Sequence, residues 1–205
     1  HQGMIRAAIS LFTGYLQIHQ AGYQSEQNII YSFPLNEKVK EYLESSALIT
    51  GYSERLCADA LAQAGTNISG TKICGVIPEK EIKTSRVAQT FFPEMNKTPE
   101  GIETSRRFSG QFLESSKPGE AILGYDLARS LQVEVGDQIS ILTQDLYQSL
   151  AARNFQVQGI SKTGATEYDS GLMLVNLSEL QDLLNLPGQV TQVVVMTKDS
   201  SAAPE

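Results

Sequence analysis

The segment from Gly119 to Asp169 constrains the fold more than any other part of the chain. It contains the short apolar run Ala121-Ile122-Leu123 and, after Gly136-Asp137, two stretches in which apolar and polar residues alternate, Ile139-Ser140-Ile141 and Phe155-Gln156-Val157. Such alternation indicates half-buried strands, and glycine beside aspartate is typical of tight turns. We predict strand, helix, tight turn, strand, loop and strand, which favours an α+β fold.

Helical spacing and turn chemistry predict further elements on both sides of this segment. They are a helix over 4–12, a strand over 12–19, a helix from Asn36 to about Ser45, strands over 47–62 and 68–77 with an irregularity at Gly51, a short helix after Ser85, a strand over 107–113, and strand, helix and strand over 173–197. We predict that both chain ends form one sheet with helices on a face. Residues 79–152 would form a second subdomain between them, and residues 199–205 a solvated linker.

Three local expectations are specific enough to be compared with a structure. Asn36 is a plausible N-cap for a helix that buries the face formed by Leu35, Val39, Tyr42 and Leu43. Asn176 is expected to cap the leucine-rich helix that ends before Pro187-Gly188, with Glu179 placed as in a capping box. Residues 144–153 are expected to form a polar loop.

The two cysteines, Cys57 and Cys74, lie equally far from a predicted turn at Gly65-Thr66. They would therefore face each other in an antiparallel hairpin, where a disulfide forms only if the Cα atoms lie within bridging range. Two interpretations stay open, a disulfide formed in an oxidising compartment or two half-buried free thiols. The absence of a Cys-x-x-Cys motif argues against a redox-active pair.

Charge and motifs exclude several classes of function. The formal net charge is −7, and the basic residues are scattered, with Arg106-Arg107 the densest pair. Bulk electrostatics therefore disfavour nucleic acid and anionic membrane surfaces as partners. The sequence has no Gly-x-x-x-x-Gly-Lys-Ser/Thr loop, so the chain is not expected to hydrolyse ATP by itself.

The residues that could support catalysis do not form a recognisable constellation. Imidazole is available only from His1 and His19, and His19 is expected at a polar surface position of a strand. Ser161 and Lys162 are neighbours in a strand and would point to opposite faces. Three carboxylates lie in turn-like polar segments, where a solvated group is expected: Glu79, Glu81 and Asp169. We predict no catalytic, cofactor or metal site.

An ordered series of short segments extends over nearly the whole chain. The segments are Leu11–His19, Gly75–Glu81, Ile122–Ala128, Val135–Asp137, Phe155–Ile160, Thr163-Gly164, Tyr168-Asp169 and the leucine-rich helix that ends at Leu186-Pro187-Gly188. Each segment is little more than a turn with its flanking strand. In this order and spacing, the series resembles the periplasmic domain of ABC transporter permeases of the MacB/FtsX-like superfamily, in particular the LolC/LolE-like branch.

The resemblance implies a location and a division of the chain. Such a domain projects into the periplasm from the inner membrane, between the first and second of four transmembrane helices. Residues 1–12 would then be a membrane-proximal stalk helix, and residues 199–205 would lead to the next transmembrane helix. A porter-like subdomain would comprise residues 13–78 and 153–198, with residues 79–152 inserted as a Sabre-like subdomain.

The resemblance also implies partners and a mode of action. Two permease subunits pair, as a homodimer or a heterodimer, and a cytoplasmic ATPase drives them. Movement passes through the stalks to the periplasmic domains, by mechanotransmission, for export or for lipoprotein release, with a lipoprotein cargo or a periplasmic protein as a further partner. The alternative hypotheses are a stand-alone periplasmic lipoprotein- or ligand-binding domain, and a hydrolase that uses His19 or a carboxylate.

One region departs from the LolC pattern. LolC-like subunits carry a proline-containing hook, which recruits the lipoprotein carrier LolA, between the Gly-Asp strand and the Phe-x-Val-x-Gly strand. Here that region, Thr143 to Asn154, is short and has no proline. The sequence therefore predicts no hook of this type, and a LolE-like subunit or an exporter of another cargo both fit it.

Overall fold

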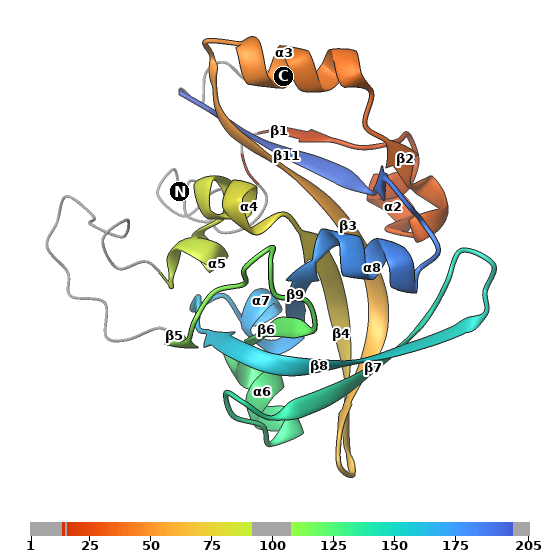
Figure 1. Ribbon diagram of the computed structural model, residues 1–205, viewed down its shortest axis with the longest axis vertical. Helices are drawn as coiled ribbons and strands as arrows, with labels where there is room; N and C mark the ends of the chain where they lie inside the picture. The colour runs from red at the N-terminus through yellow and green to blue at the C-terminus, as the bar shows by residue number, and fades with distance from the viewer. Residues whose placement is uncertain (1–13, 15, 92–107, 199–205) are drawn as a thin grey trace, which may run out of the picture.

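The computed structural model describes residue 14, residues 16–91 and residues 108–198. The helix expected over residues 4–12 and the linker expected over residues 199–205 lie outside this part. Within it, helices and strands are mixed, so the predicted α+β class is confirmed (Figure 1).

The described strands form one large sheet and one small pair. The sheet contains β1 (Leu16–Ile18), β3 (Ile49–Ala64), β4 (Asn67–Val76), β5 (Phe108–Gly110), β6 (Glu120–Gly124), β7 (Gln138–Gln144), β8 (Leu150–Ser161), β9 (Leu172–Asn176) and β11 (Gln192–Thr197). Their order is β1-β11-β3-β4-β9-β6-β8-β5, and β7 pairs with both β3 and β8. Strands β2 (Phe33–Pro34) and β10 (Gln189–Val190) form the small pair.

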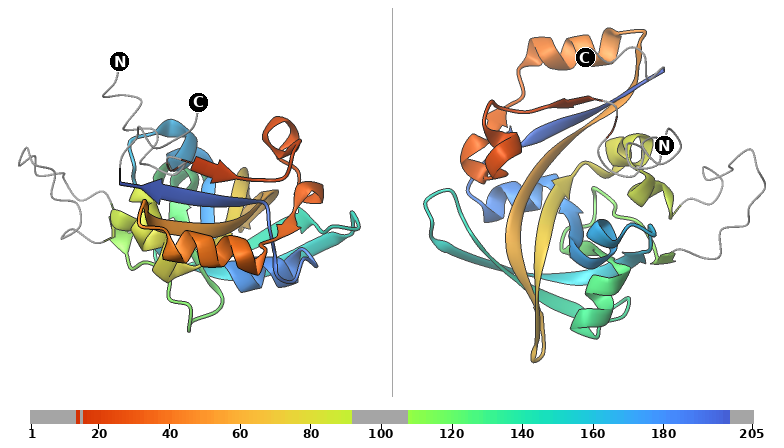
Figure 2. Two further views of the ribbon diagram at one scale, coloured as in Figure 1. Left: turned by 90° about the horizontal axis from the view of Figure 1, so that it is seen from above. Right: turned by 180° about the vertical axis from the view of Figure 1, so that it is seen from behind.

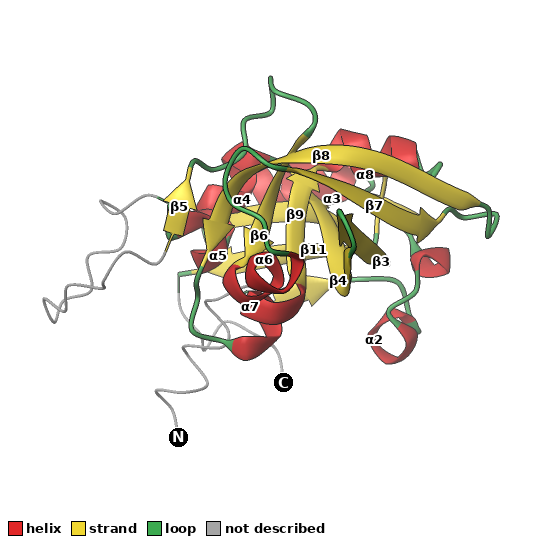
Figure 3. Cartoon of the chain, turned by 90° about the horizontal axis from the view of Figure 1, so that it is seen from below, coloured by secondary structure: helices red, strands yellow, loops and turns green. Residues whose placement is uncertain are grey.

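The double pairing of β7 closes part of the sheet on itself. Strands β3, β4, β9, β6, β8 and β7 follow one another in a ring, because β7 joins β8 on one side and β3 on the other. Figure 3 shows this ring from below. Closure removes exposed strand edges, which would otherwise be available for pairing with another chain.

Strand β3 is the longest of the described elements and links the ring to the terminal strands β11 and β1. Of its 16 residues, those from Arg55 to Ala64 pair with β4 along one edge, while the other edge pairs first with β11 and then with β7. Figure 2, seen from behind, shows β3 running from the helix above the sheet to the hairpin tip below. The expected irregularity at Gly51 is present, because the register with β11 shifts between Met196, opposite Gly51, and Thr197, opposite Ile49.

The helices are short and lie at the ends and faces of the sheet. They are α2 (Tyr23–Glu26), the 3-10 turn η2 (Ile29–Tyr31), α3 (Glu37–Ser45), α4 (Pro78–Thr84), α5 (Arg86–Gln89), α6 (Tyr125–Leu131), α7 (Thr166–Gly171) and α8 (Leu177–Leu183). The cap predicted for α3 is confirmed, since Lys38 N donates to Asn36 Oδ1 at 2.8 Å. Tyr42 was wrongly assigned to the buried face of α3, because Leu43 is buried and Tyr42 is exposed.

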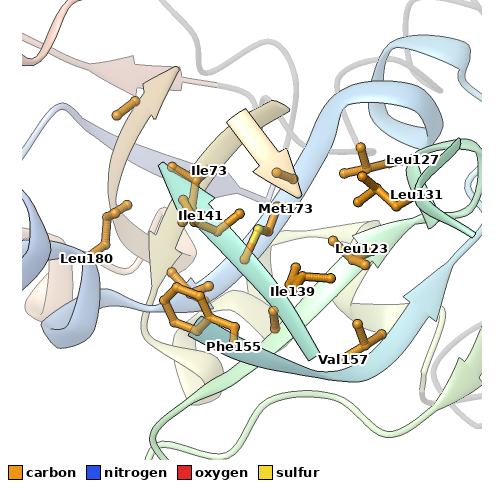
Figure 4. Packing of buried hydrophobic residues seen from close by; sticks show 14 of the residues in the cluster. Ile73, Leu123, Leu127, Leu131, Ile139, Ile141, Phe155, Val157, Met173 and Leu180 are labelled. Carbon is orange, nitrogen blue, oxygen red and sulfur yellow. The ribbon is translucent and has the colours of Figure 1, made fainter. Parts of the chain in front are cut away.

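The main core fills the ring of strands. Figure 4 shows inward-pointing side chains from several strands, among them Leu123, Ile139, Phe155 and Met173. A second cluster packs on the opposite face of β6 and β9, where Ile122 and Leu174 meet residues of α5, β3 and β4. Its members include Val87, Ala88, Phe91, Cys57 and Cys74. Neighbouring residues of a strand point to opposite faces, so Ile122 packs in the second cluster and Leu123 in the main core.

Two further local expectations, a polar loop and a capping box, differ from the structure. The polar loop expected over 144–153 is mostly strand, because Gln144 pairs with Leu150 and only residues 145–149 form the turn. Asp145 makes this turn compact, as its Oδ1 accepts from Tyr147 N at 2.9 Å and from Ser149 N at 2.8 Å. An aspartate that binds backbone N–H groups is a usual source of tight turns.

Asn176 is the N-cap residue of α8, as expected, but the capping box is absent because the Asn176 side chain makes no hydrogen bond to the helix. The Asn176 side chain instead donates to the carbonyl oxygens of Glu114 and Lys117, at 3.2 Å and 3.1 Å. The Glu179 carboxylate accepts from Gly119 N at 2.8 Å. Both side chains therefore hold the turn before β6 against α8, a tertiary role that the spacing of a cap could not distinguish.

The boundaries predicted for the two subdomains remain a prediction. Strands β6 and β7, from the segment 79–152, pair directly with β8, β9 and β3, which come largely from outside it. Strand β8 itself extends across the boundary between residues 152 and 153. A division of the chain at these positions therefore separates segments that share one hydrogen-bonded sheet.

Candidate functional site

Two ionic side chains without solvent exposure join strand β3 to helix α4. Arg55 Nη2 lies 2.6 Å from Glu81 Oε1, and Arg55 Nε donates to Glu81 Oε2 at 3.0 Å, with both side chains 0% exposed. Ser53 Oγ adds a hydrogen bond of 2.7 Å to Glu81 Oε2. Burying two charges is costly, and bidentate geometry with further hydrogen bonds is what offsets that cost.

The expectation that Glu81 is a solvated carboxylate is therefore wrong. The sequence analysis predicts no helix over residues 78–84, where the structure has α4. This helix starts with Pro78 in its first turn, where a proline removes no helical hydrogen bond. This helix lies beside the part of β3 that precedes its pairing with β4, and it turns Glu81 toward Arg55. Glu79 does match its expectation, since it is exposed and accepts a hydrogen bond from Ser115 Oγ at 2.8 Å.

A second ion pair extends this contact toward α3. Lys80 Nζ donates to both carboxylate oxygens of Glu54 at 2.9 Å and to the Tyr52 hydroxyl at 2.9 Å. The Tyr52 hydroxyl in turn donates to Glu44 Oε1 at 2.7 Å. Burial lowers the pKa of Lys80, but the hydrogen bonds from its ammonium to Tyr52 and Glu54 outweigh burial, so the pKa is raised and the charge is kept.

We call the five residues that connect β3 to α4 the ionic joint: Ser53, Glu54, Arg55, Lys80 and Glu81. The joint lies at the start of the segment 79–152. It fixes α4 in one orientation, because each charge has a partner of opposite sign at a defined distance. None of these five residues lines the small cavity beside Tyr168, the cleft beside His19 or the groove beside Leu150 in the described chain.

The third carboxylate, Asp169, is also buried, against expectation. Its Oδ1 accepts from Thr163 N at 2.7 Å and from Thr163 Oγ1 at 2.8 Å, and its Oδ2 accepts from Gly164 N at 2.9 Å. The carboxylate thus closes the loop between β8 and α7. Gly124 lies against the same helix, since a Cβ atom there would lie 2.4 Å from the carbonyl oxygens of both Tyr168 and Asp169.

Each of the remaining catalytic candidates makes its own local contact. His19 follows β1, is partly exposed, and has its ring centroid 5.9 Å from that of Tyr23. Ser161 is buried and shares a hydrogen bond of 3.1 Å with Thr90. Lys162 Nζ lies 4.3 Å from the centroid of the Tyr125 ring. His1 lies outside the described residues, so this candidate has no structural counterpart.

The two cysteines are brought together as the hairpin predicted. Cys57 lies directly opposite Cys74 in the β3–β4 register, which confirms the predicted pairing of positions. Their Sγ atoms are 2.06 Å apart and their Cα atoms 4.2 Å apart, with both residues buried. The structure thus contains the pair in its disulfide form.

A cleft of about 640 Å³ lies over the sheet face next to these cysteines, between α2 and α7. Its floor includes Asp59 and Lys72, directly opposed in the register and 3.8 Å apart as an ion pair. Amide, hydroxyl and imidazole groups surround them: Gln17, His19, Gln24, Gln27, Thr71, Tyr168 and Gln192. No sequence motif marks this cleft, because its residues come from many separate elements.

Two further properties concern the described residues as a whole. Among residues 14, 16–91 and 108–198, no group of histidine, cysteine, aspartate and glutamate side chains is arranged to hold a metal ion. In the same part of the chain, no helix combines the length and the apolar character that crossing a bilayer requires.

Comparison with known protein sequences identifies relatives over most of the chain. The lipoprotein-releasing system transmembrane protein LolC of Xylella fastidiosa (strain Temecula1 / ATCC 700964) is 27% identical over 162 residues, which cover 76% of this chain and 35% of that protein. The protein of the same name from Neisseria meningitidis serogroup B (strain ATCC BAA-335 / MC58) is 29% identical over 151 residues, covering 70% of this chain and 32% of it. The chain thus spans about a third of the length of these relatives.

Comparison with solved structures supports the same fold. The extracellular domain of the noncanonic ABC-type transporter YknZ from Gram-positive bacteria aligns with a TM-score of 0.54 at 12% identity, covering 90% of this chain and 83% of that one. The periplasmic region of MacB from Actinobacillus actinomycetemcomitans gives 0.53 at 10% identity, covering 89% and 73%. The family model for the MacB-like periplasmic core domain matches residues 7–205. This chain is therefore a member of the MacB-like periplasmic core domain family.

Proposed function

We propose that this chain is the periplasmic part of an inner-membrane ABC transporter permease and that it couples ATP hydrolysis in the cytoplasm to cargo export or lipoprotein release by mechanotransmission. Family membership and similarity to LolC proteins support the general kind of protein. The coupling role, the cargo and the partners are the proposal, and the arrangement of the strands supports the coupling role.

The observation that carries the proposal is the position of the two ends of the described chain. Leu16 in β1 lies opposite Val195 in β11, so the two terminal strands are adjacent at one end of the sheet (Figure 1). Strand β11 then pairs with β3, with Val195 opposite Tyr52. A displacement applied to both chain ends therefore reaches β3 through backbone hydrogen bonds alone.

Strand β3 is suited to carry such a displacement through the domain. It extends without a break from the terminal strands into the ring, where β4 and β7 hold its second half on both edges. A strand bonded on both sides moves with its neighbours as one body, and packed interiors transmit strain because they are hardly compressible. The ionic joint fixes α4 to β3, so the segment 79–152 would follow the same movement.

The partners belong to the proposal as well. A cytoplasmic ABC ATPase would supply the movement, and a second permease subunit, identical or different, would complete the membrane assembly. A lipoprotein cargo or another periplasmic protein would bind the periplasmic face. The region between Thr143 and Asn154 is the tip of the β7–β8 hairpin and has no proline, so recruitment of a carrier through a LolC-type hook is not part of the proposal.

The proposal is tested first in the parent gene and then in the assembled transporter. The gene should encode a transmembrane helix before Met4 and another after Glu205, and a gene without them would refute the proposal. In proteoliposomes that contain the full-length permease and its ATPase, the variant Arg55→Met/Glu81→Leu should keep ATP hydrolysis and lose cargo movement. The matched control Glu37→Gln alters an exposed pair with Lys40 and should leave both rates unchanged. Unchanged cargo movement in the double variant would show that the joint does not transmit force.

A second candidate function is favoured by the cleft of about 640 Å³, whose volume lies in the range of small-molecule sites. In this case the chain would be a stand-alone periplasmic domain that binds a lipoprotein or another ligand. The parent gene separates the two candidates. A signal peptide with no transmembrane helix would support the binding domain and exclude the permease.

We also propose that Cys57 and Cys74 form a disulfide in the cell. The periplasm is an oxidising compartment in which disulfides persist. The opposed strands place the two residues directly opposite each other, with a Cα separation of 4.2 Å, just below the range that is usual for disulfides. The division into a porter-like part, 13–78 with 153–198, and a Sabre-like part, 79–152, is likewise retained as a proposal.

A further inference from the structure

A groove on the outer face of the ring has apolar walls that face solvent. It has a volume of about 560 Å³ and lies between the segment of α2 and η2 and the β7–β8 hairpin. Four of its large apolar residues are substantially exposed: Ile30 at 57%, Leu61 at 48%, Leu142 at 37% and Leu150 at 72%. Apolar residues that are exposed together, with polar groups around them, mark surfaces that bind another molecule.

The strand register makes this apolar surface continuous. Leu61 of β3 lies directly opposite Leu142 of β7, and Leu142 lies opposite Ala152 of β8. Leu150 pairs with Gln144, two positions along the same face from Leu142. Directly opposed residues in antiparallel strands have Cβ atoms about 5 Å apart, so these side chains form one strip.

Charges on the groove are of one sign. Among the residues that line it, Glu26, Asp59 and Asp145 carry carboxylates, and none is lysine, arginine or histidine. Lys72 does not itself line the groove, but its Nζ lies 3.8 Å from Asp59 Oδ1 and donates to Gln27 Oε1, and both of these residues do. The other two carboxylates have no cationic partner in the described chain: Glu26 accepts from the Tyr31 hydroxyl, and Asp145 accepts from backbone N–H groups.

We propose that this groove docks an apolar segment, flanked by lysine or arginine side chains, of a separate protein. The leucine strip would bury the apolar residues of the partner segment, and the carboxylates would pair with its flanking lysine or arginine side chains. Such charge pairs attract the partner over a distance and fix the register in which it binds. An anionic lipid surface is the wrong partner for an acidic rim. A second copy is disfavoured as well, because each chain carries a formal charge of −7. The proposal concerns a binding surface and does not depend on the transport function.

The test uses two labelled peptides with opposite charge and the same leucines, KLLAKLLAKLL and ELLAELLAELL. Their binding to the 205-residue chain is followed by fluorescence anisotropy at low and at physiological salt. The lysine peptide should bind with saturation, more weakly at high salt, and the glutamate peptide should not bind.

Two variants examine the two halves of the proposal. Leu142→Ser/Leu150→Ser should weaken binding of the lysine peptide by about tenfold or more, since each buried leucine contributes on the order of a factor of ten. Glu26→Gln/Asp145→Asn keeps the hydrogen-bond acceptors but removes two charges, and it should weaken binding by about threefold to tenfold and reduce the salt dependence. Ile68→Ser is the matched control, since Ile68 is an exposed apolar residue of β4 outside the groove, and should bind like the unaltered chain.

Several results would overturn the proposal. One is that the lysine peptide binds the leucine variant and the Ile68→Ser control with equal affinity. Another is that the lysine and glutamate peptides bind the unaltered chain equally well. Binding of the unaltered chain to vesicles rich in anionic lipid, abolished in the leucine variant, would assign the groove to a membrane. Self-association in sedimentation that disappears in the leucine variant would assign it to a second copy.

Discussion

The guanidinium of Arg55 and the carboxylate of Glu81 form a bidentate pair inside the protein, with 26 positions of sequence between the two residues. One residue belongs to the central strand β3, and the other to the first helix of the segment 79–152. Neither side chain is exposed to solvent, so the attraction between them is not screened by water. This pair defines how that segment starts and where it is attached.

Removal of one partner of this pair should be strongly destabilising. Glu81→Ala leaves Arg55 buried and without its carboxylate, and the free energy of unfolding should fall by about 3–5 kcal/mol. Urea unfolding followed by circular dichroism measures the change. Glu37→Ala removes an exposed partner of Lys40 and should cost less than about 1 kcal/mol. A Glu81→Ala variant as stable as Glu37→Ala would contradict the buried pair.

Loss of the bond between Cys57 and Cys74 should also lower stability. The bond closes a loop with a sequence separation of 17, for which constraint of the unfolded chain is worth about 3 kcal/mol. The variant Cys57→Ala/Cys74→Ala should therefore unfold at lower urea than the oxidised protein, and dithiothreitol should shift the unaltered protein in the same direction. Thiol titration of denatured protein, purified without reductant, should find no free thiol. Two free thiols per chain would show that the disulfide does not form.

A methyl group at position 124 should disturb the contact between β6 and α7. The Cβ atom of Gly124→Ala would lie 2.4 Å from the Tyr168 and Asp169 carbonyl oxygens, and backbone atoms cannot move away as a flexible side chain could. We expect a loss of about 1–3 kcal/mol in the free energy of unfolding. Gly171→Ala is the control, because no atom lies within 4 Å of a Cβ there. Equal stability of the two variants would show that β6 and α7 are less closely packed.

Glu120 should make stability depend on pH. Burial raises the pKa of its carboxyl group, nearby Lys117 lowers it, and the carboxylates of Glu114 and Glu179 raise it further, while Oε2 is buried without a described partner. A raised pKa means that the folded state binds the proton more tightly than the unfolded state. Stability is therefore lost as pH rises from the ordinary glutamate pKa, about 4.3, through the raised value.

The variant Glu120→Gln removes this loss. It should unfold at higher urea than the unaltered protein at about pH 7, and at about the same urea at pH 3, where the unaltered carboxyl is protonated in both states. Glu134→Gln, at an exposed glutamate, should show no such difference at either pH. A stability gain for Glu120→Gln that is equal at both pH values would mean that charge is not its cause.

Local patterns predicted those parts of the fold that neighbouring residues determine. The hairpin of β3 and β4 was expected with its turn at Gly65-Thr66, and the register places Ala64 opposite Asn67 as expected. Asn36 caps α3, and the leucine-rich helix ends before Pro187. Turn residues, caps and apolar periods act within a few positions of sequence, so a reader of the sequence can recognise them.

The candidate sites are harder to predict, because their partners lie far apart in the sequence and local patterns do not reach them. Glu81 and Asp169 were expected in water, because charged residues in polar segments are usually solvated. Their burial depends on partners that the sequence does not mark. The partner of Glu81 is Arg55, on a strand 26 positions earlier. The partners of Asp169 are Thr163 and Gly164, whose N–H groups reach its carboxylate only in the closed loop. The cleft and the acidic groove have no motif either, since each is assembled from several elements.

The sequence alone determined the α+β class, the facing positions of Cys57 and Cys74 in the hairpin and, through an ordered series of turns, the family. Only the tertiary structure decided that the segment from Gly119 to Asp169 closes a ring. That closure requires Leu142 of β7 to pair with Leu61 of β3, far away in the sequence, and local propensity contains no information about such a contact. The burial of charge at the ionic joint follows from the same packing, because a carboxylate becomes an internal partner only where distant elements exclude water around it.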